Sequence, residues 1–130
     1  MTDDGPKVLL RSEDSSGQVA VVELAGGGRP PLHRHDFDEA FYVVEGELTF
    51  QLGGDVFTRG PGELAFAARG TTHTYANLSG EPARALVIIT PAGFERYFDH
   101  IAARISGDEP PPEAAKPIPE VETVGPPLGD

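Results

Sequence analysis

Three side chains able to bind a metal ion lie close together in the segment HRHDFDE, which begins at His33. His33 and His35 are two residues apart, and Glu39 follows four residues later. On a β-strand, side chains of the same parity share one face. The segment therefore predicts two imidazoles and one carboxylate on one face of a strand, a donor set that suits a borderline divalent metal.

A third histidine, His73, follows a further predicted strand and can complete a site of three nitrogens and one oxygen. Such a site leaves positions open for a substrate or for dioxygen, as catalytic metal sites do. The residue types alone leave an alternative open, since pairs of histidines also occur in exposed loops. The neighbouring Asp36 and Asp38 fit solvated loop residues better than ligands, and we expect His100, on a predicted helix, to be a structural or surface residue.

Short apolar runs separated by glycine and proline must position these side chains, a pattern typical of an all-β sandwich or barrel. The predicted strands are QVAVVEL, AFYVV, ELTFQL, DVFTR, ELAFA and RALVIIT. QVAVVEL and RALVIIT are apolar on both faces, so we expect a helix or a second subunit to cover their outer side, which favours a homodimer.

One segment, PAGFERYFDHIAARI, has the period of a helix, and Gly107 is placed to end it. We expect its aromatic stripe to pack on the exterior of the barrel. Residues 1–106 then form a single domain, whereas residues 107–130, with seven prolines in 24 residues, form an acidic tail that is extended or disordered.

Composition limits the possible partners. The 130 residues contain no cysteine, which excludes disulfides and thiolate metal sites, and the net charge of −11 makes nucleic acid and anionic membranes unfavourable partners. The polar, acidic start does not resemble a signal peptide, and no apolar run approaches the length of about 18 residues that spans a bilayer. We therefore expect a cytoplasmic protein with a small-molecule partner.

Two spaced motifs resemble the paired motifs of the cupin superfamily, over roughly residues 19–90. The first comprises Gly27, His33, His35, Glu39 and Gly46, and the second comprises Gly62, Ala68, Gly70, His73 and Asn77. The resemblance implies an antiparallel double-sheet (jelly-roll) barrel with one short C-terminal helix and an extended tail. It also implies that His33, His35, Glu39 and His73 hold one divalent transition metal per chain: Fe, Mn, Ni, Co, Cu or Zn. Asn77 would have a structural or supporting role, and Ala68 departs from a proline in the family pattern.

The layout is similar to that of small bacterial quercetinase-like cupins, which implies a metal-dependent dioxygenase acting on a small aromatic or enolisable substrate. Glu39 would be both a ligand and a general base. The predicted substrate pocket is lined by Phe41, Phe50, Phe66 and Tyr75, with core packing as the alternative role for at least two of them. Two other functions remain open: a cyclase, isomerase or lyase that does not use dioxygen, and a non-catalytic small-molecule binding protein.

Overall fold

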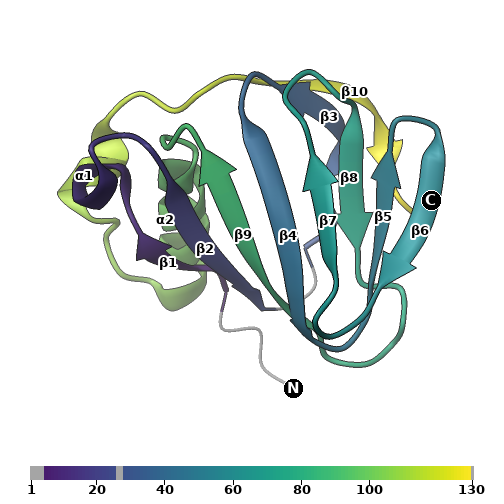
Figure 1. Cartoon of the computed structure of the whole chain (residues 1–130). Coiled ribbons are helices and arrows are strands. Elements are labelled where there is room, and N and C mark those ends of the chain that lie inside the picture. Colours follow the sequence, from purple (N-terminus) through teal and green to yellow (C-terminus); the bar gives the residue numbers. More distant parts are fainter. Residues whose placement is uncertain (1–4, 26–27, 130) are drawn as a thin grey trace.

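The computed structural model describes residues 5–25 and 28–129, and these fold into two antiparallel sheets of five strands each (Figure 1). Gly27 of the first motif lies outside the described residues. The first sheet has the order β1 (Lys7–Leu10), β2 (Ala20–Ala25), β9 (Arg84–Thr90), β4 (Asp38–Glu45) and β7 (Leu64–Ala67). The second has the order β10 (Val121–Pro127), β3 (Pro31–His35), β8 (His73–Ala76), β5 (Leu48–Leu52) and β6 (Asp55–Arg59).

The predicted double-sheet, all-β architecture is confirmed. Each of the six predicted runs forms a strand, namely β2, β4, β5, β6, β7 and β9. Within the described ranges no strand pairs across from one sheet to the other, so the sheets form a sandwich and do not close into a barrel by hydrogen bonding. Gly46 carries the chain from β4 to β5 with a φ of +77°, and a Cβ there would lie 2.3 Å from the carbonyl oxygen of Pro82.

The core lies between the two sheets and follows the alternation of the strands. In β4, Phe41 and Val43 point inward while Tyr42 is exposed. In β9, every second residue is buried, and these residues face the inner positions of β2 and β4 in register. The first sheet therefore has one well-packed face and one outer face, and the outer face also carries large apolar side chains.

Three helical segments accompany the sheets: α1 (Ser12–Ser15), α2 (Glu95–Ser106) and the 3₁₀ turn η1 (Pro112–Ala115). Gly107 ends α2 in the left-handed conformation, as predicted. The aromatic stripe does not pack on the exterior of the sheets, which corrects the expectation. α2 lies behind β1 and β2 in Figure 1, and Phe98, together with Phe94 just before the helix, packs against the core. None of the helices described here is long and apolar enough to cross a membrane.

The segment after Gly107 includes η1 and the edge strand β10. β10 pairs with β3 from Val121, opposite His35, to Pro127, opposite Pro31. Its register shifts on either side of Gly125, and prolines are tolerated because the strand lies at the edge of the sheet. The segment is thus extended against the sheet. The division into residues 1–106 and 107–130 stays a prediction.

Candidate metal centre

Four side chains meet between the two sheets at one end of the sandwich. His33 and His35 come from β3, His73 from β8 and Glu39 from β4. One possible ligand atom from each residue lies within 4.8 Å of the others, so the group could hold a metal ion. His33 and His73 are direct partners in the antiparallel ladder, with ring centroids 4.4 Å apart. The structure therefore brings together all four predicted ligands.

The route by which these residues meet differs from the prediction. β3 ends at His35, and the chain then crosses from the second sheet to the first before β4 begins at Asp38. Glu39 therefore approaches the histidines from the facing sheet and not from the same strand. A shared strand face is the wrong explanation for the cluster, which forms because two facing sheets project inward side chains into the same space.

The three imidazoles are held in one tautomer by the backbone. The Nδ1 atoms lie close to carbonyl oxygens: 2.6 Å for His33 to Pro31, 3.0 Å for His35 to Phe37 and 2.9 Å for His73 to Thr71. A carbonyl oxygen only accepts hydrogen bonds, so each Nδ1 carries the hydrogen. The Nε2 atom of a neutral ring is then a free electron-pair donor, as a metal ligand must be.

The donors converge in a way that calls for a cation. The Nε2 atoms of His35 and His73 lie 2.8 Å and 3.0 Å from the same oxygen, Oε1 of Glu39. The lone pairs of the two nitrogens and the negatively charged carboxylate oxygen repel one another unless a proton or a metal ion lies between them. All three residues are buried, so water does not relieve the repulsion. The side chains present fit a bound divalent metal.

The electrostatics favour the ligand forms of these groups. Burial lowers the pKa of His33 and outweighs the opposing effect of the Pro31 carbonyl, which favours the neutral ring. Burial alone would raise the pKa of Glu39, but hydrogen bonds from His35 and His73, formed when a proton lies between the ring nitrogens and Oε1, outweigh burial and lower it. A cation bound at the same place would lower it for the same reason. A neutral imidazole and an ionised carboxylate are the states that bind a metal.

A cavity of about 640 Å³ opens beside the cluster, with His33 and Glu39 in its wall. Of the four predicted pocket residues, Phe41 and Tyr75 line this cavity. Phe50 is fully buried in the core, the alternative that the sequence left open. Phe66 lies instead on the outer face of β7 and is 53% exposed.

The placement of Phe66 corrects the prediction and has a packing reason. The inward residues of β7 are Ala65 and Ala67, which lie opposite Phe41 and Glu39 in register. Small side chains at these positions leave room for Phe41 and Glu39 between the sheets. The phenyl ring of Phe66 is therefore turned outward.

The model of the cupin domain family matches residues 20–89, which is more than half of the chain and includes all four clustered residues. The chain belongs to the cupin family. This cupin is 27% identical over 95 residues to quercetin 2,3-dioxygenase from Bacillus subtilis. The match covers 71% of this chain but only 28% of that protein, so the chain spans less than a third of the curated relative's length.

Solved structures show the same fold. TT1209 from Thermus thermophilus is 26% identical with a TM-score of 0.58, over 69% of this chain and 87% of that one. The polyketide cyclase RemF from Streptomyces resistomycificus is 28% identical with a TM-score of 0.58, over 65% of this cupin and 63% of RemF.

The outer wall of the cavity comes from residues beyond the matched range. α2 and the residue before it contribute Phe94, Tyr97, Phe98, Ile101 and Ile105. The segment that leads into β10, together with β10, contributes Ile118, Pro119, Val121 and Thr123. The helical period identified the stripe of α2, but sequence periodicity does not say which surface a stripe faces. This cupin therefore has a largely apolar cavity whose outer wall comes from α2 and the segment around β10, whereas His33 and Glu39 belong to its inner wall.

One neighbour of the cluster was not anticipated from the sequence. The ring of Phe37 stacks on His35 with centroids 3.6 Å apart and planes 3° from parallel, and it lies 5.1 Å from the ring of Phe94. Phe37 thus fixes the plane of one predicted ligand and links it to α2. The only sequence signal was an aromatic residue between two acidic residues, Asp36 and Asp38.

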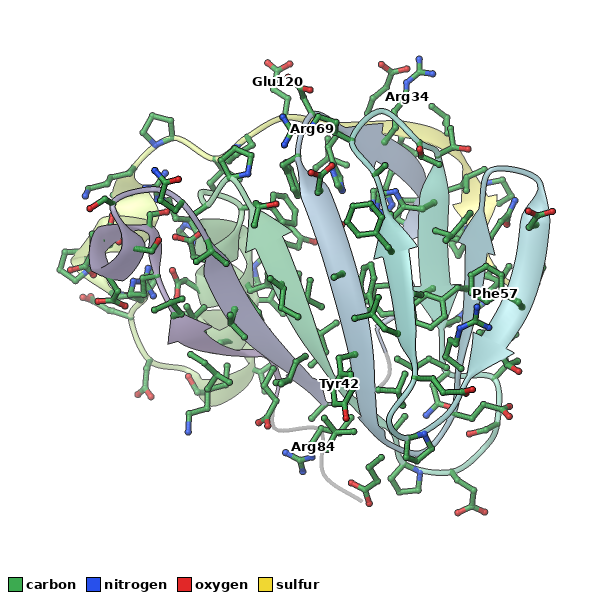
Figure 2. All side chains as sticks on the ribbon, viewed as in Figure 1. Arg34, Tyr42, Phe57, Arg69, Arg84 and Glu120 are labelled. Carbon is green, nitrogen blue, oxygen red and sulfur yellow. The ribbon has the colours of Figure 1, made fainter. Side chains whose placement is uncertain are left out.

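The remaining polar candidates lie outside the cluster. Asp36 is exposed, and Asp38 accepts hydrogen bonds from Arg69 at the upper rim of this cupin (Figure 2). The Nε2 atom of His100 lies 3.0 Å from the carbonyl oxygen of Ala114. Asn77 donates to the carbonyl of Glu81, which is a structural role.

The alanine at position 68 does not prevent the turn before His73. The amide of Thr71 donates to the carbonyl of Ala68 at 3.0 Å, and Gly70 has a φ of +82°. The amide of Gly70 also donates to the carbonyl of His35 at 2.8 Å. The turn is therefore tied to the end of β3, next to the cluster.

Proposed function

We propose that this cupin is a metal-dependent dioxygenase that acts on a small aromatic or enolisable substrate. The observation that carries the proposal is the shared orientation of three Nε2 atoms and one carboxylate at the wall of an apolar cavity. The 27% identity to quercetin 2,3-dioxygenase supports the choice of chemistry. A dioxygenase inserts both atoms of dioxygen into its substrate, so the reaction needs no external reductant.

In this proposal His33, His35, Glu39 and His73 hold one divalent transition metal per chain. When bound, such an ion draws electron density from a substrate oxygen and can exchange electrons between substrate and dioxygen. The histidines keep their Nε2 atoms directed at the ion through the carbonyl contacts of Nδ1. Phe41 and the aromatic residues of α2 bind the apolar body of the substrate and exclude water.

Glu39 is proposed to be the general base as well as a ligand. Its contacts with His35 and His73 involve Oε1, and no hydrogen bond to Oε2 is found within the described ranges. Glu39 lines the cavity, so Oε2 can accept the proton of a substrate hydroxyl as that oxygen becomes anionic.

A second candidate is a cyclase, isomerase or lyase in which the metal acts only as a Lewis acid. The 28% identity and shared fold with the polyketide cyclase RemF favour it. The two candidates differ in one requirement, because only the dioxygenase consumes dioxygen.

Oxygen uptake by the metal-loaded protein tests the proposal across a panel of flavonols, catechols and diketones. Uptake that matches substrate loss is the expected result. Conversion that continues without dioxygen would identify the second candidate. Binding without conversion under either condition would identify a non-catalytic binding protein.

We also propose that the protein forms a homodimer through the outer face of the first sheet, defined by Val21, Tyr42, Leu64, Phe66, Leu86 and Ile88. Tyr42, Leu64 and Phe66 are exposed, and α2 covers the other side of this sheet. The charged residues nearby include Arg84, which lies 3.2 Å from Glu23 and 3.7 Å from Glu45 and so reduces the repulsion between two acidic chains there (Figure 2). A second copy of the chain is the occupant that two-fold symmetry allows.

A further inference from the structure

The hydroxyl group of Tyr75 is a polar group in the cavity wall for which the described residues provide no partner. Tyr75 follows His73 by two residues on β8, so both side chains point into the space between the sheets. Its ring lies 5.4 Å from that of Phe41, on the apolar side of the cluster. A methyl group added at Gly28 would lie 3.9 Å from the hydroxyl oxygen, which places this hydroxyl beside the backbone of Gly28 in the cavity wall.

Other polar side chains in the cavity wall are engaged or hydrated. His33 and Glu39 belong to the metal cluster. Arg29 donates to the carbonyl of Leu128 at 2.7 Å. Tyr97 is 43% exposed and Thr123 is also exposed, so the hydroxyls of both can be hydrated. Tyr75 thus combines an apolar surrounding with an uncommitted hydrogen-bonding group.

We infer that the Tyr75 hydroxyl binds a second oxygen function of an aromatic ligand whose first oxygen faces the metal cluster, and so selects ligands that carry both. The inference rests on the proposed function for its ligand class. A bound ligand that covers this hydroxyl with carbon removes its hydrogen bond to water, whereas an oxygen on the ligand restores one. A ligand with the second oxygen is therefore favoured for two reasons: it forms a new hydrogen bond with Tyr75, and a ligand without it leaves the Tyr75 hydroxyl unpaired.

A matched set of ligands tests the inference without any turnover. The probes are 3-hydroxyflavone and its derivatives with one additional hydroxyl at different ring positions, titrated into the metal-loaded protein under nitrogen. We expect at least one derivative to bind about 3- to 10-fold more tightly than 3-hydroxyflavone, which is the range for one neutral hydrogen bond. Tyr75→Phe should abolish this preference and leave the affinity for 3-hydroxyflavone within about 2-fold of the native value.

A variant with the same chemical change elsewhere provides the control. Tyr42→Phe removes a hydroxyl from the outer face of the first sheet. It should keep the preference, and thermal unfolding should show that both variants fold like the native chain. A preference that survives in Tyr75→Phe, or that is absent from the native protein, would overturn this inference alone. Absence of binding by every probe would overturn the aromatic ligand class and the inference with it.

Discussion

The Nε2 atom of His35 lies 2.8 Å from Oε1 of Glu39, although the two residues belong to facing sheets. His73 places its own Nε2 atom 3.0 Å from the same oxygen. Because the Nδ1 atoms of both rings face carbonyl oxygens, the two lone pairs point at a carboxylate. This arrangement is stable only around a positive charge, which a bound metal ion would supply.

Metal removal is expected to destabilise the fold. A ligand that binds only the native state adds about 2.7 kcal/mol at a free concentration of 100 times its Kd, which corresponds to a Tm shift of about 10 °C for a domain of this size. Thermal unfolding before and after treatment with a chelator measures the effect. Readdition of the metal should restore the Tm, and an unchanged Tm after verified metal removal would contradict the account.

Glu39→Gln is expected to lower turnover even at saturating metal. The amide keeps the shape of the side chain but cannot accept a proton, so kcat should fall by about 100-fold or more. Glu45→Gln is a matched control, because Glu45 lies exposed on the same strand. Measurements over a range of metal concentrations separate weaker metal binding from a lost base. If Glu39→Gln had the native kcat at saturating metal, Glu39 would not be the general base.

Glu95→Gln is expected to lower stability in a pH-dependent way. Glu95 is fully buried at the start of α2, where it accepts hydrogen bonds from the amides of Ser12 at 2.8 Å and Gly93 at 2.6 Å. Burial alone would raise its pKa, but these bonds outweigh burial and lower it. The folded state therefore gains stability from the ionised group above the pKa of the unfolded state. That gain is lost as the pH falls through the lower pKa of the folded state.

Urea unfolding at pH 7 and near pH 3 checks this sign. At pH 7 the free energy of unfolding of the native chain should be about 1–3 kcal/mol larger than that of Glu95→Gln. This difference should shrink in acid. Glu120→Gln, at an exposed position on the upper rim, should show no such difference (Figure 2). A gap that grows on acidification would mean that Glu95 is not stabilised in its ionised form.

The proposed dimer predicts a mass of about twice 13.8 kDa in light scattering. Phe66→Glu should shift the protein to monomers, because a charge would be buried in the interface. Val56→Glu is the matched control, since Val56 is 59% exposed on β6 of the other sheet. A monomeric native protein would contradict the proposed interface, as would a Phe66→Glu variant that stays dimeric.

The sequence predicts the positions of the strands better than it predicts how side chains from different strands meet between the sheets. Alternation along AFYVV and the runs of β-branched residues depend on local geometry, so the strands appear where expected. The cluster of His33, His35 and Glu39 was predicted from a shared strand face, yet the chain changes sheets after His35. The prediction of proximity held because inward side chains of facing sheets share one narrow space.

Local sequence patterns did not predict the features that depend on tertiary packing. In ELAFA the larger residue, Phe66, suggested the inner face, but Ala65 and Ala67 are inside because Phe41 and Glu39 need room. The period of α2 identified its apolar stripe but not the cavity that the stripe faces. The tail has too many prolines to suggest a strand, although the edge position of β10 tolerates them.

Metal content is the most direct test of the metal site on which the account depends. Elemental analysis of the purified protein should give one transition metal ion per chain, and His33→Ala and His73→Ala should each lose it. His100→Ala, whose side chain contacts the backbone of Ala114 instead, should keep the native content. Unchanged metal stoichiometry in both His33→Ala and His73→Ala would contradict the assignment of the site.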